Sequence, residues 1–260
     1  MSRIPRAVVV ALRLLVVGAL AGVLVLATTG ASGEKPGKVE RTRLAGQPVR
    51  LTLPTGQPKG LAIWFHGQGG KVNDRMDGSF LGALLRDGWA VASSNFHLES
   101  WGNAASTEDT RLLIEWAEEQ AGVPATLWVS GSMGGAVSLN ALIHGVTAPA
   151  CWYGVKPAIS LLGMGNVPAA PGFIQAAYGG PVPEDRNPVR NIERLPLDVA
   201  YRVVTSPDDV WVPIDENAGA LASTLDQRGA DITYLMASGP HMDPSHWNSA
   251  DLVEFARGCR

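Results

Sequence analysis

The sequence lacks the features that mark several specialised classes of protein. Only 17% of its 260 residues are charged, the formal net charge is −3, and lysine and arginine are scattered rather than grouped. A nucleic-acid-binding protein needs a basic stripe or a recognisable reader motif, so nucleic acid is not expected as a partner. No internal repeat is visible in the sequence. With 46% hydrophobic residues the chain can bury a full-sized core, which excludes intrinsic disorder.

Long hydrophobic runs are also missing, except near the N-terminus. There Arg3 and Arg6 precede Leu14–Thr28, which contains no charge, and small residues follow up to Ala31. This three-part layout is typical of a secretory signal peptide. The uncharged run is shorter than the roughly 20 residues that cross a bilayer. We therefore predict that residues 1–31 are a signal peptide and that the protein is secreted or held in the cell envelope; an uncleaved N-terminus would instead associate with the membrane.

Cysteine is rare, since the chain contains only Cys151 and Cys259. In an oxidising compartment an even number of cysteines allows one disulfide, which here would close a long loop. The alternative is a pair of unconnected thiols with Cys151 in the core. The sequence alone leaves both possibilities open.

Strand and helix patterns alternate through the rest of the chain. Residues 32–40 are polar and contain glycine and proline, which predicts a linker, and residues 41–260 then form one domain. A hairpin and five short apolar runs that end at turn signals predict strands at Thr42–Leu44, Val49–Leu53, Leu61–Phe65, Ala90–Ser94, Thr126–Ser130, Val199–Val204 and Ile232–Met236. Helical patterns cover Thr107–Ala121, Gly134–Gly145, Glu216–Arg228 and Asp251–Arg257. This alternation predicts an α/β fold in which helices cover both faces of a mostly parallel central sheet.

One candidate nucleophile follows a predicted strand. In a parallel sheet, ligand chemistry belongs at the carboxyl ends of the strands. The segment from Ser130 to Gly135 reads Ser-Gly-Ser-Met-Gly-Gly, and its small residues allow a sharp strand-to-helix turn that exposes the hydroxyl of Ser132. The N–H of Met133 would then point toward an oxyanion on a bound acyl group. The alternatives are an ordinary Gly/Ser-rich turn, or Ser130 as the nucleophile.

A candidate acid and a candidate base follow two later strands. Asp208 and Asp209 come after Val199–Val204, and His241 comes after the last strand. Taken alone, paired aspartates beside proline are typical of a solvated turn, and a lone loop histidine is usually exposed. However, Ser132, Asp209 and His241 occur in the order nucleophile, acid, base that this kind of sheet enzyme uses.

At these positions the chain resembles the α/β-hydrolase family, over about residues 40–258. His66–Gly70 looks like the oxyanion loop of that family after its third strand, and Asp209–Pro213 looks like its D-x-x-V-P ending. The turn begins with Ser130 where the commoner pattern has glycine. The resemblance implies a set of roles: Ser132 as nucleophile, His241 as general base, Asp209 as the acid with Asp208 as fallback, and the backbone N–H groups of Gln68 and Met133 as oxyanion donors.

The resemblance also implies a short cap over the pocket at about 159–195, between the sixth and seventh strands. Apolar residues of the cap and of neighbouring loops would either line an acyl site or simply pack: Met164, Phe173, Ile174, Tyr178, Trp101 and Trp211.

The other histidines offer weaker alternatives. His246 is a rival for the role of base, whereas His66, His97 and His144 are not placed for it, and His66 is expected to shape the oxyanion loop. His241, Asp243 and His246 also suggest a metal site, but no second cluster supplies further ligands at recognisable spacing. We therefore predict no metal and no cofactor.

These observations predict a serine hydrolase that cleaves a small-molecule acyl ester through an acyl-enzyme on Ser132, similar to carboxylesterases and lipases. Peptides are less favoured as substrates, because nothing resembles the large gating domain of the peptidases in this superfamily. Two alternatives stay open: an acyltransferase that uses the same triad, and a non-catalytic binding protein with the same fold. The sequence makes no prediction about the oligomeric state.

Overall fold

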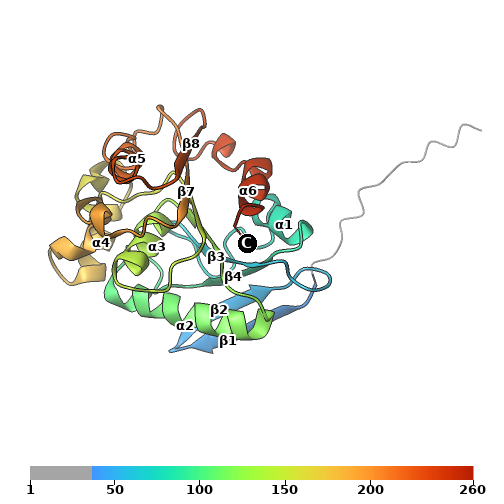
Figure 1. Cartoon of the computed structure of the whole chain (residues 1–260). Helices are drawn as coiled ribbons and strands as arrows, with labels where there is room; N and C mark the ends of the chain where they lie inside the picture. The colour runs from blue at the N-terminus through green and yellow to red at the C-terminus, as the bar shows by residue number, and fades with distance from the viewer. Residues whose placement is uncertain (1–36, 260) are drawn as a thin grey trace, which may run out of the picture. The chain divides into compact units, whose positions relative to one another are not determined.

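Eight strands form one sheet, in the order β1-β2-β4-β3-β5-β6-β7-β8 (Figure 1). The computed structural model describes residues 37–259, so the predicted signal peptide and most of the predicted linker lie outside the described residues. The strands are β1 (Val39–Leu44), β2 (Gln47–Thr52), β3 (Leu61–Phe65), β4 (Ala90–Ser94), β5 (Leu127–Gly131), β6 (Cys151–Val155), β7 (Ala200–Thr205) and β8 (Ile232–Met236). Strands β1 and β2 form the predicted hairpin, β2 pairs antiparallel with β4, and all other neighbours are parallel. The predicted mostly parallel sheet is confirmed.

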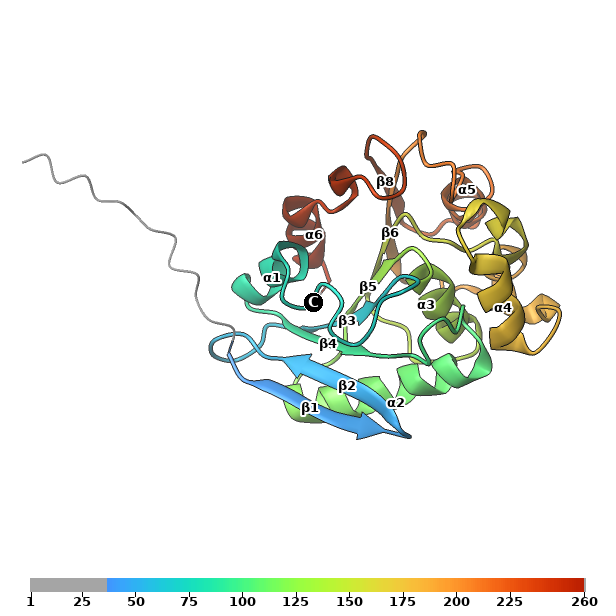
Figure 2. The ribbon, with the colours of Figure 1, turned by 180° about the vertical axis from the view of Figure 1, so that it is seen from behind.

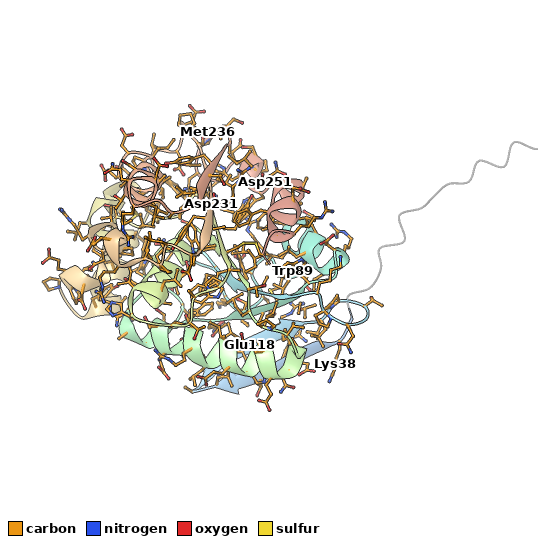
Figure 3. All side chains as sticks on the ribbon, viewed as in Figure 1. Lys38, Trp89, Glu118, Asp231, Met236 and Asp251 are labelled. Atoms are coloured by element: carbon orange, nitrogen blue, oxygen red, sulfur yellow. A yellow bond between two sulfur atoms is a disulfide. The ribbon has the colours of Figure 1, made fainter. Side chains whose placement is uncertain are left out.

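Helices cover both faces of this sheet, as Figures 1 and 2 show from opposite sides. One face carries α1 (Ser79–Arg86) and α6 (Ser249–Ala256), which pack against each other; the other carries α2 (Ala104–Ala121), α3 (Gly134–Ile143) and α5 (Ala218–Gln227). In Figure 3, Asp251 marks α6 and Glu118 marks α2. Each face has its own apolar core, one built on Phe80 and Leu252 and the other on Leu113, Leu139 and Leu221. Burial of these apolar faces is the main force that holds the helices on the sheet.

Among the strands and α-helices, β6, α1 and α4 (Ala170–Tyr178) were not assigned from the sequence; α4 lies in the segment that was expected only as a cap. Strand β6 is fully buried, but Gly154 interrupts its apolar pattern, and glycine weakens a strand signal. The structure requires glycine there, because a Cβ would lie 2.2 Å from the ring of Trp152. Helix α1 has only eight residues, too few to establish a helical period.

The predicted boundary between linker and domain is wrong by two residues. Strand β1 begins at Val39, inside the predicted linker, because Val39 and Glu40 pair with Thr52 and Leu51 of β2. Pairing in a hairpin overrides the polar composition that suggested a linker.

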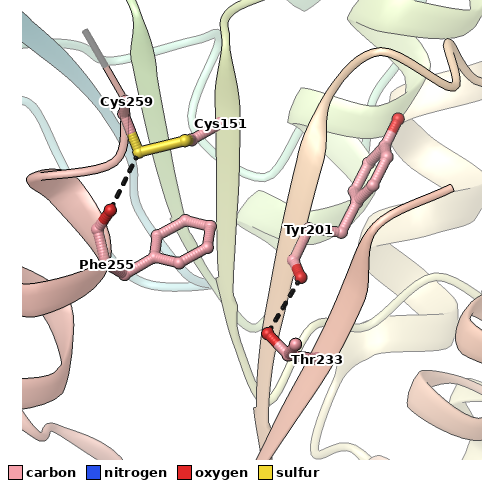
Figure 4. Close-up of a disulfide and its surroundings, with 5 residues drawn as sticks. All are labelled: Cys151, Tyr201, Thr233, Phe255 and Cys259. Carbon is pink, nitrogen blue, oxygen red and sulfur yellow. Dashed lines mark hydrogen bonds between the residues drawn. A yellow bond between two sulfur atoms is a disulfide. The ribbon is translucent and has the colours of Figure 1, made fainter.

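The two cysteines are joined in a disulfide, which resolves the alternative that the sequence left open (Figure 4). Cys151 is the first residue of β6 and Cys259 follows α6, 108 residues later in the sequence, with their Cα atoms 5.5 Å apart. Both cysteines are buried. The bond therefore ties the C-terminal segment to the amino end of a central strand.

The segment between β6 and β7 lies where the resemblance implies a cap. It contains α4 (Ala170–Tyr178) and four short 3₁₀ turns: η1 (Leu161–Asn166), η2 (Glu184–Arg186), η3 (Pro188–Arg190) and η4 (Ile192–Arg194). Within residues 37–259, no helix combines the length and the apolar character that crossing a membrane requires.

Candidate active site

The carboxyl ends of the parallel strands bring all the candidate residues to one edge of the sheet. Strand register aligns these ends: Gly131 of β5 pairs with Val155 of β6, and Thr205 of β7 pairs with Met236 of β8. The loops that follow β3, β5, β7 and β8 then carry, respectively, the segment from His66 to Gly70, Ser132, Asp209 and His241. Residues far apart in the sequence thus meet at the edge where α/β sheets place their ligand sites.

Ser132 sits on a sharp turn between β5 and α3. Its φ of +51° lies in the left-handed region, which residues other than glycine rarely adopt. The turn is held because the Ser132 N–H donates to the Val155 carbonyl at 3.0 Å and the Ser132 carbonyl accepts from Gly135 at 2.8 Å. Gly134 allows the close approach, since a Cβ at that position would lie 2.1 Å from the Phe65 carbonyl oxygen. The Ser132 hydroxyl is thereby exposed at the carboxyl ends of the parallel strands.

Ser132, His241 and Asp209 are linked by hydrogen bonds. The His241 Nε2 atom lies 3.0 Å from the Ser132 Oγ, and the His241 Nδ1 lies 2.7 Å from the Asp209 Oδ2. The other oxygen of Asp209 accepts the backbone N–H groups of Trp211 and Val212, each at 3.0 Å. Because an ionised carboxylate only accepts, Nδ1 must carry the ring proton, and Nε2 is then free to accept from the serine hydroxyl.

Burial and hydrogen bonding set the protonation states of Asp209 and His241. Burial alone would raise the pKa of Asp209, but the hydrogen bond from His241 and those from the backbone of Val212 and Trp211 bring it below its ordinary value. Burial lowers the pKa of His241, and the nearby charge of Lys156 lowers it further, whereas the hydrogen bond to Asp209 opposes both. Asp209 is thus held ionised and His241 neutral near pH 7, the states required of an orienting acid and a general base.

The loop after β3 packs directly against this turn. A Cβ on Gly67 would lie 3.4 Å from the Cβ of Ser132, so the two segments are in van der Waals contact. The N–H of Gly69 donates to the Glu99 carboxylate at 3.2 Å, and that of Gly70 donates to the Gly67 carbonyl at 3.0 Å. These two N–H groups are therefore already occupied.

The N–H groups of Gln68 and Met133 have no acceptor among the hydrogen bonds found within residues 37–259. Both residues lie at the correct edge, Gln68 in the loop that lines the cavity and Met133 immediately after Ser132. His66 contacts the Gly67 carbonyl through Nδ1 at 2.9 Å, in keeping with its expected effect on the loop. The structure thus leaves the two predicted oxyanion donors unoccupied by protein groups.

The rival candidates lie elsewhere. Asp208 is exposed and accepts from the Gly239 N–H instead of contacting His241. Ser130 is fully buried in β5. His246, in η5 (Pro244–His246), is buried and contacts the backbone carbonyl of Asp243. The structure therefore does not bring Asp208, Ser130 or His246 into the hydrogen-bonded chain.

The alternative metal site is also not assembled. Asp243 caps the turn η5 by accepting the Ser245 N–H at 2.9 Å, while His241 faces Ser132. Within residues 37–259 there is no group of three or more His, Cys, Asp or Glu side chains that could hold a metal ion.

A cavity of about 450 Å³ opens above Ser132. Of the six apolar residues considered for an acyl site, only Trp211 lines it, and its ring lies 5.2 Å from that of His241. Trp101, Met164 and Ile174 are buried in a separate core beneath the cap, which contributes Val167 and Pro168 to the cavity instead. Another cavity of about 390 Å³ lies beside α1 and contains none of the candidate residues.

Sequence reasoning missed three residues that line the same cavity: Arg75, Lys156 and Trp247. Lys156 directly follows β6, so assigning that strand would have placed it at the carboxyl edge. Trp247 stands in the segment that drew attention to His241. Arg75 lies between β3 and α1 and has no comparable signal in the sequence.

Comparisons with known proteins identify the fold. No protein-family model matches the chain, and no curated protein matches it in sequence. Among solved structures, it is similar to an esterase/lipase from an uncultured bacterium, with 19% identity, a TM-score of 0.67, and coverage of 85% of this chain and 84% of that one. It is also similar to a fluorophosphonate-binding serine hydrolase of Staphylococcus aureus, with 13% identity, a TM-score of 0.68, and coverage of 86% and 99%.

A puromycin hydrolase is similar as well, with 17% identity and a TM-score of 0.65 over 87% of this chain. The chain spans only about 40% of that protein's length, and 39% of a puromycin-hydrolysing peptidase of Mycobacterium tuberculosis. Together with the eight-stranded, mostly parallel sheet, these likenesses show that the chain has the α/β-hydrolase fold. The fold implied by the resemblance is confirmed.

Proposed function

We propose that this protein is a serine hydrolase that cleaves carboxylic esters through an acyl-enzyme on Ser132. The observation that carries the proposal is the unbroken hydrogen-bonded chain from Asp209 through His241 to the hydroxyl of Ser132. An esterase/lipase and a serine hydrolase among the similar structures support the same reaction class. A non-catalytic binding protein would not need these three side chains to be aligned.

The first half of the reaction forms the acyl-enzyme. The Ser132 Oγ attacks the acyl carbonyl carbon while its proton passes to the His241 Nε2. The carbonyl oxygen becomes an oxyanion that accepts the N–H groups of Gln68 and Met133. When the tetrahedral intermediate collapses, the bond to the alcohol oxygen breaks and the alcohol takes the proton from His241. Asp209 stabilises the imidazolium that forms between these steps.

The second half of the reaction releases the acid. A water molecule gives a proton to His241 and attacks the acyl carbon, which forms a second oxyanion at the same donors. Collapse breaks the bond to the Ser132 Oγ, which recovers its proton from His241. In an acyltransferase an alcohol or an amine would replace this water.

Esters are proposed as substrates because two esterases stand among the similar structures. Each corresponds to this chain over 84% of its own length, with TM-scores of 0.67 and 0.68.

Export of the protein belongs to the same proposal. Disulfides persist in oxidising compartments, so the bond between Cys151 and Cys259 supports a secreted or cell-envelope protein with a cleaved N-terminal segment. The mass of the protein purified from its native host tests this point, because cleavage after Ala31 removes residues 1–31.

The decisive test is hydrolysis of p-nitrophenyl esters, from acetate to long acyl chains, by the wild type and by Ser132→Ala. We expect the variant to lose at least about a thousandfold in activity. A wild type that hydrolyses no ester, or a variant with undiminished activity, would overturn the proposal. Product analysis with and without an added alcohol separates hydrolysis from acyl transfer.

A further inference from the structure

Two cations meet an aromatic ring beside Ser132. The Arg75 Cζ lies 3.5 Å from the centroid of the Trp247 ring, and the Lys156 Nζ lies 5.1 Å from it. The same ring packs next to the nucleophile, because a Cβ on Gly131 would lie 3.0 Å from it. Arg75, Lys156, Trp247 and Ser132 all line one cavity.

Neither cation has a carboxylate partner. None of the ion pairs found within residues 37–259 includes Arg75 or Lys156. Lys156 is 4% exposed, and its Nζ donates to the backbone carbonyl of His241, which leaves further donor capacity. The two positive charges are also close enough that Arg75 helps lower the pKa of Lys156, after burial as the main cause. Buried charge without a counter-ion is costly, so this arrangement is unusual unless an anion enters the cavity.

The carboxylates nearby do not neutralise the pair. Asp209 is engaged by His241, and the half-buried Asp243 caps a turn. Both carboxylates raise the pKa of Lys156, but burial and the charge of Arg75 outweigh them and leave it below its ordinary value. Asp74 lines the cavity and raises the pKa of Arg75, but burial of the guanidinium has the larger effect and leaves that pKa below its ordinary value. The guanidinium therefore faces the cavity with unused donors.

The backbone conformation of both cations is strained. Arg75 has φ +56° and Lys156 has φ +42°, as Ser132 has φ +51°. A left-handed conformation costs a residue other than glycine about 1 kcal/mol or more, and such strain gathers at functional sites. The fold thus holds two long cationic side chains next to the nucleophile at a cost in stability.

We propose that Arg75 and Lys156 form a carboxylate-binding subsite beside Ser132, so that the preferred ester carries a negatively charged carboxylate. The planar guanidinium, fixed on Trp247, offers a fork of donors to both carboxylate oxygens, and Lys156 adds a second charge. This inference rests on the proposed function and narrows it to one substrate class.

Paired substrates that differ only in charge test the subsite. On the acyl side, p-nitrophenyl hydrogen adipate is compared with its methyl ester; on the alcohol side, 4-acetoxybenzoate is compared with its methyl ester. For at least one pair we expect kcat/KM to be about ten times higher for the anion at low salt, with the ratio falling as salt screens the charges. A ratio near or below one in both pairs would overturn the subsite.

Variants assign the preference to Arg75. In Arg75→Gln only Lys156 is left to attract the carboxylate, so the ratio of anionic to neutral kcat/KM should fall most of the way to one, whereas Arg75→Lys should keep more of it. Arg41→Gln removes the same charge from an exposed position on β1 and should keep the wild-type ratio. A ratio that stays unchanged in Arg75→Gln, or falls equally in Arg41→Gln, contradicts the assignment.

A binding measurement separates the subsite from the catalytic proposal. In Ser132→Ala, monomethyl adipate should bind about tenfold more tightly than dimethyl adipate by calorimetry, and Ser132→Ala/Arg75→Gln should lose most of this difference. If the wild type hydrolyses no ester, the proposed function fails, and this comparison still decides the subsite. If neutral esters are hydrolysed through Ser132 but neither measurement detects a preference for the anion, only the subsite fails.

Discussion

The two ends of the parallel sheet are built in different ways. At the amino end, the disulfide between Cys151 and Cys259 joins β6 to the segment after α6. At the carboxyl end, the loops hold all but one of the non-glycine residues with positive φ in the described chain, the exception being Ala45 in the turn between β1 and β2. The comparison teaches that covalent stabilisation and backbone strain are kept at opposite ends of the same strands. Strain can then be concentrated where reacting groups must be presented, while the rest of the sheet supports it.

The largest expected effect is on catalysis at the carboxyl end. Asp209→Asn removes the negative charge that orients His241, so we expect kcat to fall by about 10⁴-fold. Asp208→Asn is the matched control, because the neighbouring carboxylate is exposed and contacts only the loop. Steady-state kinetics on a p-nitrophenyl ester measure both. Equal losses in the two variants would mean that the acid has been assigned to the wrong residue.

The next effect is on stability at the amino end. Replacing both cysteines by serine opens a loop of 108 residues, and the chain-entropy model predicts a loss of about 4.7 kcal/mol in the free energy of unfolding. Because the site lies at the other end of β6, kcat of the folded protein should stay unchanged. Denaturant unfolding and kinetics on one preparation measure the two quantities. A drop in kcat without a loss of stability would contradict the claim that the disulfide end of the sheet affects stability and not catalysis.

A smaller effect on stability and activity is expected at Gly134, in the tight turn that follows Ser132. Gly134→Ala places a Cβ only 2.1 Å from the Phe65 carbonyl, so the backbone must shift, at a cost of about 1–3 kcal/mol, and Ser132 must move with it. Gly165→Ala is the control, since nothing lies within 4 Å of a Cβ there. The midpoint temperature of thermal unfolding and the esterase activity should both fall in Gly134→Ala. Neither should fall in Gly165→Ala. A fully active Gly134→Ala protein would show that the turn tolerates a side chain.

The smallest effect concerns the pH profile. Since the general base must be neutral, kcat/KM falls as the pH drops through the pKa of His241. Burial lowers this pKa below the ordinary 6.5, so the midpoint of the acid limb should lie below that value. Lys156→Met removes a nearby positive charge that also lowers the pKa, and should move the midpoint to higher pH. A wild-type midpoint above 6.5 would contradict the electrostatic description of the site.

Much of the fold could be predicted from the sequence, because buried strands leave short apolar runs and helices leave a 3.6-residue period. The residues that follow these strands pointed to Ser132, Asp209 and His241, which the structure brings within hydrogen-bonding distance. The stack of Arg75 on Trp247 could not be predicted, because it joins two loops about 170 residues apart whose contact depends on tertiary packing.

The disulfide also has a consequence for the order of events during synthesis. Cys259 follows the last strand and α6 in the chain, so every strand of the sheet has been made before its sulfur can reach Cys151. Their Cα atoms must come within 5.5 Å of each other, which requires β6 and α6 to be near their final places. The bond therefore cannot choose the strand order while the chain is being made. The bond forms late and stabilises a strand arrangement that hydrophobic burial has already selected.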